Sequence, residues 1–268
     1  MTDTGKMAVH PWLIFREAWG ICRKNLVKLS ALYLVFYIPY LLIALLAIAI
    51  PGDQTNILNI IITLVGLWSG VTLLVAAYKA SQAEKFGVGE SLIGAGRYFL
   101  KYLGASFLGF ITIVGVLLVT ASVAIVGSAL TARTSVLLSA GIQLAAVVVA
   151  ISLLVYFMIR WALAGASCVL ENKGPIGALK RSRELIKDYI NPVVGTYLIY
   201  MVTLLLASIP YMIVLSILGD SSDGMEAEVL IGAINNIVIN TILIPFLYVI
   251  MVVLYRKLKE ANEANVRA

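Results

Sequence analysis

Charged side chains are scarce in this sequence of 268 residues. Asp, Glu, Lys and Arg together make up 13% of it, whereas a soluble domain contains about 25%. Histidine occurs once, at His10, and cysteine twice, at Cys22 and Cys168. These three scattered ligands are too few for a Cys/His zinc site, which takes four. We therefore expect no metal and no other cofactor.

Residue patterns typical of catalytic sites are also missing. The sequence has no glycine loop of the kind that binds phosphate, no Ser/His/Asp set and no pair of carboxylates within an apolar run. General acid–base catalysis needs such groups close together. We predict that the chain is not an enzyme.

Apolar residues, in contrast, are abundant: they make up 61% of the chain, and the mean hydropathy is +0.99. A helix needs roughly 20 apolar residues to cross the hydrocarbon core of a bilayer. Six runs reach that length without the alternation of strands: 26–50, 57–79, 103–127, 136–159, 193–218 and 229–255. We predict an all-α polytopic membrane protein with six transmembrane helices. No soluble domain is left over, so residues 1–268 form a single integral membrane domain in this interpretation.

The basic residues predict the orientation of these spans. Nineteen of the 20 Lys and Arg residues fall at the two termini or after the second and fourth spans, and the exception is Arg133. Because Lys and Arg concentrate on the cytoplasmic side of membrane proteins, both termini are expected in the cytoplasm. The net charge of +6 then reflects orientation, and we expect no nucleic acid as a partner. Both cysteines fall on the same reducing side, so no disulfide is expected.

The only long polar interval lies between the fourth and fifth spans. Asn172 and Gly174 predict a turn, Pro175 suits the first position of a helix, and Pro192 ends it. One face of this helix is largely apolar and the other is rich in Lys and Arg, which is typical of a helix lying in the plane of the membrane interface. The apolar face consists of Ile176, Leu179, Ser182, Ile186 and Ile190.

Similar amphipathic segments precede the first and third spans, which predicts three cytoplasmic in-plane helices. Each is followed by a pair of spans, so the plan is a threefold internal repeat with units at about 11–80, 88–160 and 175–257. Glu84 and Gly87 match Glu171 and Gly174 at a constant offset. Each glutamate leads into a glycine turn, where we expect it to accept backbone N–H groups or to pair with an arginine. Gly174 and Pro175 are interpreted as structural residues of such a turn.

Several segments resemble a known family. They are Phe-Arg-Glu-Ala-Trp at 15–19, Arg-Trp-Ala-Leu-Ala at 160–164, Val-Leu-Glu-Asn-Lys-Gly-Pro-Ile-Gly-Ala-Leu-Lys-Arg-Ser-Arg-Glu-Leu at 169–185 and Leu-Tyr-Arg-Lys-Leu at 254–258. They are similar to the membrane domain of glycerophosphodiester phosphodiesterases and to related uncharacterised prokaryotic integral membrane proteins. The resemblance implies the plasma membrane of a prokaryote. It carries over no catalytic residue, because in that family the chemistry belongs to a soluble barrel that this sequence lacks.

Two groups of polar residues are candidates for a functional site. The first lies within the even-numbered spans and could line a path for a solute or a lipid headgroup, or could join helices by hydrogen bonds: Asn59, Gln143, Asn236 and Asn240. The second is basic and could bind anionic headgroups or only orient the protein: Arg97, Lys101, Lys180, Arg181, Arg183 and Lys187.

The hypothesis that these observations favour is interaction with lipids or other amphiphiles of the inner leaflet, by sensing, scaffolding or transport. The expected partners are membrane lipids, anionic ones above all. Two alternatives stay open. The protein could be a channel or facilitator for a small neutral solute, or a membrane subunit of a larger complex with a protein partner or with further copies of itself.

Overall fold

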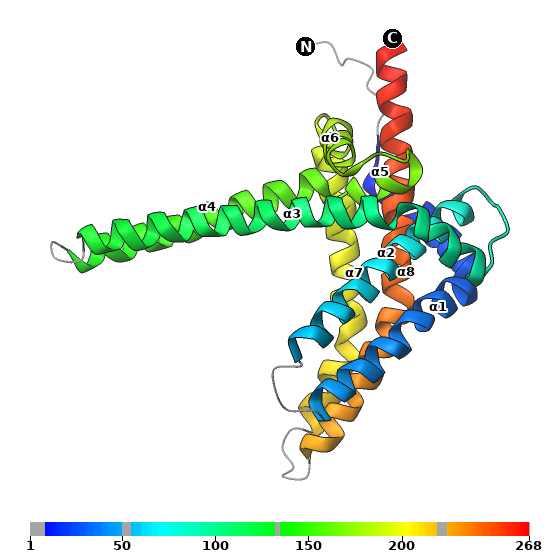
Figure 1. Cartoon of the computed structure of the whole chain (residues 1–268), viewed down its shortest axis with the longest axis horizontal. Helices are drawn as coiled ribbons and strands as arrows, with labels where there is room; N and C mark the ends of the chain where they lie inside the picture. Colours follow the sequence, from blue (N-terminus) through cyan, green and yellow to red (C-terminus); the bar gives the residue numbers. More distant parts are fainter. Residues whose placement is uncertain (1–8, 50–54, 132–134, 219–223, 268) are drawn as a thin grey trace. The chain divides into compact units, whose positions relative to one another are not determined.

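The computed structural model describes residues 9–49, 55–131, 135–218 and 224–267. Within these ranges, side chains are described except at 40, 43–49, 55, 56, 59, 215–218, 224–236, 238, 266 and 267. The described backbone forms α-helices joined by short turns and contains no strand, which confirms the all-α prediction. The helices are α1 (Pro11–Ala49), α2 (Thr55–Ser81), α3 (Val88–Thr131), α4 (Val136–Trp161), α5 (Ala164–Leu170), α6 (Pro175–Ile186), α7 (Ile190–Leu218) and α8 (Gly224–Arg267) (Figure 1).

Five helical segments are long and apolar enough to cross a membrane. They are Ile60–Ser81, Val88–Thr131, Val136–Leu170, Ile190–Val214 and Ile239–Asn265. Five of the six predicted spans coincide with these segments. The remaining one, 26–50, falls on α1, but much of it lies outside the residues whose side chains are described.

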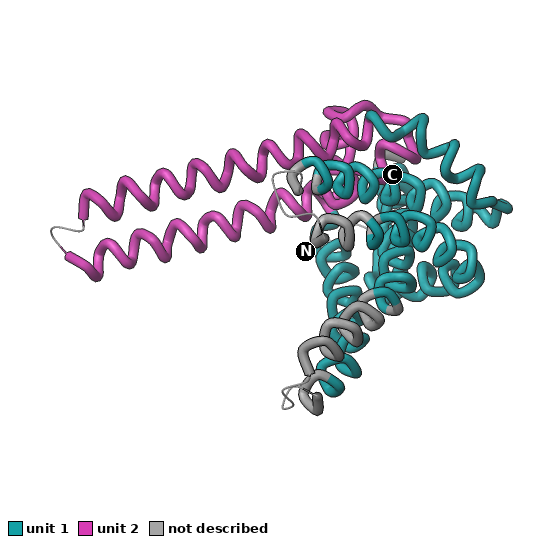
Figure 2. The backbone as a smooth tube through the Cα atoms, turned by 60° about the horizontal axis from the view of Figure 1, so that its bottom comes forward, with its two compact units in different colours: residues 1–100, 189–268 teal, residues 101–188 magenta. Residues whose placement is uncertain are grey.

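The chain divides into two compact units, shown in different colours in Figure 2. Unit 1 comprises residues 1–100 and 189–268, and unit 2 comprises residues 101–188. Helix α3 belongs to both, because its first residues are in unit 1 and the rest are in unit 2. The single integral domain and the three repeat units stay predictions.

Unit 1 is a bundle in which α1 packs against α2, α7 and α8, and α8 also contacts α2 and α7. Leu29, Leu74 and Ile250 are fully buried between these helices. Aromatic contacts join α1 to α8: the rings of Phe15 and Trp19 meet the ring of Phe246 edge to face at centroid distances of 5.1 and 5.4 Å.

The terminal helices of unit 1 meet at one end of the bundle. Near the start of α1, Glu17 pairs with Lys257, near the end of α8, at 3.4 Å. The Arg256 guanidinium donates to the Ser81 carbonyl at the end of α2, at 2.9 Å. Tyr189, just before α7, accepts a hydrogen bond from Asn265 at 2.7 Å. The first residues of α1 and α7 therefore lie beside the last residues of α2 and α8.

Helix α8 contains a proline whose effect is compensated by neighbouring helices. Pro245 has no N–H, so the Thr241 carbonyl one turn earlier lacks its usual donor. The Ser30 hydroxyl of α1 donates to this carbonyl at 3.0 Å. The Tyr200 hydroxyl of α7 donates to the nearby Leu243 carbonyl at 3.2 Å. Two side chains thus support α8 around its proline.

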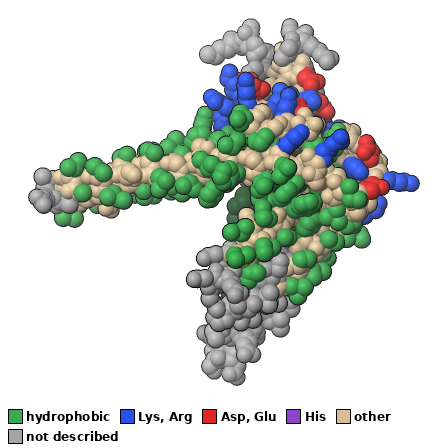
Figure 3. Space-filling model, viewed as in Figure 1, with side chains coloured by type: hydrophobic (Ala, Val, Ile, Leu, Met, Phe, Trp, Pro, Cys, Tyr) green, Lys and Arg blue, Asp and Glu red, His purple; other side chains and the backbone are tan. Residues whose placement is uncertain are grey.

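In unit 2, α3 and α4 form a long hairpin whose helices lie side by side (Figures 1 and 2). They approach closely at Gly127, where an added Cβ would lie 2.9 Å from a methyl carbon of Ile142. None of the described residues of α4 is buried, and hydrophobic side chains cover the hairpin (Figure 3). Such exposure is expected of helices surrounded by lipid, where apolar side chains need not face a protein core.

The segments predicted as in-plane helices are arranged differently from the expectation. The first and second are continuous with the following spans in α1 and α3, because no proline or turn separates them. At about 1.5 Å per residue, the 44 residues of α3 extend about 66 Å, twice the thickness of the hydrocarbon core. The third is a separate helix, α6, but it ends at Ile186 rather than Ile190. The short helix α5 was not predicted.

Candidate functional site

The loop between α5 and α6 is held by several contacts within unit 2. Asn172 has a φ of 54°, a left-handed conformation that asparagine tolerates better than most residues. The Lys101 ammonium of α3 donates to the Asn172 side-chain oxygen at 2.7 Å and to its carbonyl at 3.3 Å. Pro175 then opens α6 and packs so closely on Gly104 that an added Cβ there would lie 2.6 Å from the proline ring.

Glu171 and Arg181 form a two-pronged ion pair beside this loop. The Arg181 Nε and Nη2 atoms donate to the two Glu171 carboxylate oxygens at 3.1 and 3.2 Å. The Arg181 side chain is only 28% exposed and the Glu171 side chain 12%. Paired N–H donors fix a carboxylate in a defined orientation. The pair therefore joins α6 to the end of α5.

Ser182 connects α6 to the break between α4 and α5. Its hydroxyl donates to the Arg160 carbonyl at 2.8 Å and accepts from the Leu163 N–H at 3.2 Å. Breaks between helices leave such backbone groups without intrahelical partners, and Ser182 is fully buried. The serine in the predicted apolar stripe thus has a structural role that periodicity alone did not reveal.

Burial on α6 follows only part of the predicted apolar face. Ser182 and Ile186 are buried, as are Ala178 and Leu185, whereas Ile176 is 74% exposed.

The six predicted basic site residues fall into two groups. Lys101 and Arg181 are occupied by the intramolecular contacts described above. Lys180, Arg183 and Lys187 are exposed on α6 or just after its end, three and four residues apart, which places them on one side of the helix. Arg97 is exposed on the part of α3 that belongs to unit 1.

Glu84 occupies a turn of unit 1 and differs from its predicted counterpart Glu171. It is exposed, and its backbone N–H donates to the Lys79 carbonyl at 3.0 Å. Ala83, next to it, has a φ of 57°. The turn is therefore closed by backbone hydrogen bonds, and a role for the Glu84 carboxylate stays a prediction.

Of the four polar candidates within the predicted spans, the structure describes the side chains of Gln143 and Asn240, which belong to different units. The side chains of Asn59 and Asn236 lie outside the described residues. Gln143 is exposed on α4 in unit 2. Asn240 lines a cavity of about 320 Å³ in unit 1, between α1, α2 and α8.

Three tyrosines that were not predicted as site residues line the same cavity: Tyr33, Tyr37 and Tyr248. The spacing of Tyr33 and Tyr37 places them on one face of a helix, and their rings stack at a centroid distance of 5.4 Å. This spacing of four residues is the feature of the sequence from which the two tyrosines could have been predicted to lie together.

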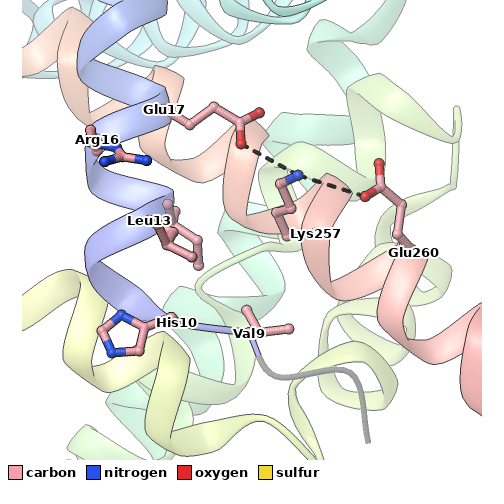
Figure 4. Close-up of a pocket in the computed structure, with 8 residues that line it drawn as sticks. Val9, His10, Leu13, Arg16, Glu17, Lys257 and Glu260 are labelled. Carbon is pink, nitrogen blue, oxygen red and sulfur yellow. Dashed lines mark ion pairs between the residues drawn. The ribbon is translucent and has the colours of Figure 1, made fainter.

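A second hollow of unit 1, of about 500 Å³, lies where the start of α1 meets the end of α8 (Figure 4). His10, Leu13 and Arg16 line it from α1 and the residues just before it. Across from them, the Lys257 ammonium lies 3.4 Å from a Glu17 carboxylate oxygen and 3.9 Å from one of Glu260. These charges are exposed and of both signs, so the hollow favours no single class of ligand.

Both cysteines are buried and free. Cys22 is fully buried on α1, and burial raises the pKa of its thiol to about 11. Cys168 is also buried and free. Over the ranges that the structure describes, no three His, Cys, Asp or Glu residues are grouped so that they could hold a metal ion.

The fold places the chain among helical proteins with several segments able to cross a membrane. More specifically, it belongs to the family described as Domain of unknown function (DUF7847), whose model matches residues 54–258. Neither a curated protein nor a solved structure matches the chain.

Proposed function

We propose that this protein is a six-span protein of the plasma membrane that interacts with anionic lipids of the inner leaflet through α6. The observation that carries the proposal is the exposed set Lys180, Arg183 and Lys187. The opposite side of the same helix is buried and fixed by Ser182. In this view the resemblance to the membrane domains of glycerophosphodiester phosphodiesterases concerns the fold, and the protein itself has no catalytic role.

The contacts between the terminal helices support an even number of crossings. Glu17 and Lys257 pair at 3.4 Å, which supports an arrangement with the start of α1 and the end of α8 on one side of the membrane. Five segments qualify as spans among the described residues, and an odd number would separate these ends. The sixth crossing is therefore assigned to residues 26–50 of α1. The distribution of Lys and Arg places this end in the cytoplasm.

The arrangement of α6 supports the view that its basic residues contact lipid headgroups and do more than orient the protein in the membrane. The Glu171–Arg181 pair and the two hydrogen bonds of Ser182 hold the helix in place. The three exposed cations are thus presented on a fixed element. Each basic residue near an anionic surface contributes about 1 kcal/mol. Together they would favour an anionic lipid by about 3 kcal/mol, roughly a hundredfold in affinity.

The test is native mass spectrometry of the protein released from nanodiscs that contain equal amounts of phosphatidylglycerol and phosphatidylcholine. The wild type should retain phosphatidylglycerol selectively. The variant Lys180→Gln/Arg183→Gln/Lys187→Gln should lose most of this selectivity. Arg181 is left unchanged, because its loss would disturb the loop and blur the result.

A matched control removes three exposed charges from unit 1 instead, in the variant Arg23→Gln/Lys24→Gln/Lys85→Gln. It should retain the selectivity of the wild type. Equal losses in both variants would show a general effect of net charge. Undiminished selectivity in the α6 variant would refute the proposal.

A further inference from the structure

The cavity that contains Asn240 is polar but uncharged. Hydroxyl and amide groups of Tyr33, Tyr37, Ser69, Asn240 and Tyr248 line it, together with apolar residues of the same helices. Each of these side chains can both donate and accept hydrogen bonds. No Lys, Arg, Asp or Glu is found among its described lining residues. At about 320 Å³ the cavity lies within the size range of small-molecule sites.

An apolar groove of about 640 Å³ adjoins this cavity. Phe36 and Val65 line both, so the two spaces are neighbours at these residues. The rest of the groove is formed by side chains such as Leu64 and Trp68 of α2 and Phe99 of α3, all in unit 1. The rings of Trp68 and Phe99 contact each other at a centroid distance of 4.7 Å. No charged residue appears among the described residues that line the groove.

We propose that unit 1 binds one amphiphile with an uncharged, hydroxyl-bearing head, whose head occupies the tyrosine cavity and whose hydrocarbon chain lies in the groove. A charged head would leave water without meeting an opposite charge, which is costly in an apolar environment. A hydroxylated head exchanges its water hydrogen bonds for those of the tyrosines and Asn240. The chain then covers the apolar groove. This site is distinct from the exposed cations of α6.

Gly66 offers a way to close the cavity without disturbing the bundle. It lines the cavity, and a Cβ added there would meet nothing within 4 Å. A leucine at this position would extend into the space that the head occupies. Gly115 of α3 is a matched control, because its added Cβ also meets nothing within 4 Å, and it lines neither space.

The experiment compares three probes on detergent-purified protein by native mass spectrometry. Monooleoylglycerol has an uncharged head, oleate has the same chain with a carboxylate at pH 8, and glycerol has no chain. We expect one bound monooleoylglycerol per wild-type chain and at least tenfold weaker binding of oleate. Gly66→Leu should weaken monooleoylglycerol binding at least tenfold, whereas Gly115→Leu should leave it unchanged.

The other outcomes overturn the proposal in different ways. Unchanged binding by Gly66→Leu would exclude the cavity as the site. Equal binding of oleate would exclude an uncharged head as the selected feature. Displacement of monooleoylglycerol by an equal concentration of glycerol would point to a solute instead of an amphiphile.

A second measurement does not depend on the stability of Gly66→Leu. In the variant Trp12→Phe/Trp19→Phe/Trp161→Phe, Trp68 is the only tryptophan left of the four. A monoacylglycerol with a dibrominated chain should quench Trp68 fluorescence saturably, at one equivalent per chain. Unbrominated monooleoylglycerol should compete for this quenching. Quenching that rises linearly with the lipid-to-detergent ratio, without saturation, would refute the placement of the chain.

Discussion

Pro245 shows how one residue in a long apolar helix determines the role of another. Its missing N–H leaves the Thr241 carbonyl available, and the Ser30 hydroxyl donates to it at 3.0 Å. In an apolar medium a carbonyl without a donor is costly. The hydrogen bond from α1 to α8 therefore matters because α8 contains a proline at this position.

This dependence predicts a coupling between the two residues. Ser30→Ala should lower the free energy of unfolding by about 1 kcal/mol, the usual size of a hydrogen bond between membrane helices. In a Pro245→Ala background, the alanine N–H can satisfy the Thr241 carbonyl, so the same serine substitution should cost much less. The measurement is unfolding in mixed micelles of the four proteins of this double-mutant cycle. Additive effects in the cycle would contradict the mechanism.

The polar residues of the site were only partly predictable from the sequence. Asn240 was identified because an amide within an apolar run is conspicuous. The tyrosines beside it were not identified, because tyrosine is a common residue in apolar helices. The sequence does not show that Tyr33 and Tyr37 of α1 line the same cavity as residues of α2 and α8. Similarly, a list of basic residues could not separate Arg181, which pairs with Glu171, from the exposed Arg183.

At the scale of elements, α6 depends on one buried hydroxyl. Ser182 bridges the Arg160 carbonyl and the Leu163 N–H at the break after α4. Ser182→Ala would leave both backbone groups without this partner, and an unsatisfied buried group costs about 1–3 kcal/mol. We therefore predict a loss of about 2 kcal/mol in the local stability of α6.

Hydrogen exchange followed by mass spectrometry measures this loss. Amides of residues 175–186 should exchange about thirtyfold faster in Ser182→Ala, the factor that corresponds to about 2 kcal/mol. Ser152→Ala is the control, because that exposed hydroxyl donates only within its own helix, to the Val148 carbonyl at 2.8 Å. Exchange at the wild-type rate in Ser182→Ala would show that other contacts fix α6.

Helix boundaries were predicted correctly where a residue such as proline marks them in the sequence. Pro175 begins α6 as expected. The end of α6 at Ile186 and the helix α5 were not predicted. Ser182 and Glu171 contact the residues Leu163 and Arg181 there, and periodicity carries no information on such contacts. In α1, the polar Asn25 lies inside the helix, where its amide donates to the Ile21 carbonyl at 3.0 Å, so it marks no boundary.

At the scale of the whole molecule, hydropathy located the helical segments that could cross a membrane, because each is a long apolar run. It could not indicate that α2 and the second half of α8 are half buried in unit 1 while the helices of the α3–α4 hairpin are exposed. The buried share of the most apolar window is 50% in α2 but 0% in the segment that contains α4. Both runs are similarly apolar, so only packing distinguishes them.

The pairing of Glu17 with Lys257 leads to a prediction about topology. If the chain crosses the membrane six times, Lys24→Cys and Ala264→Cys should both react with a membrane-impermeant maleimide only after the cells are permeabilised. Val136→Cys, at the start of α4, should react in intact cells. All three positions are exposed in the structure.

The native cysteines make this assay feasible without removing them. Cys22 is buried, and its pKa of about 11 leaves only about one thiolate in ten thousand at pH 7. Cys168 is buried as well. Labelling of the wild type should therefore be slow, and any rapid signal reports the introduced cysteine. If Lys24→Cys and Ala264→Cys reacted on opposite sides, the number of crossings would be odd. The contact at 3.4 Å between Glu17 and Lys257 could not then exist in the membrane, and the assignment of residues 26–50 as the sixth span would fail with it.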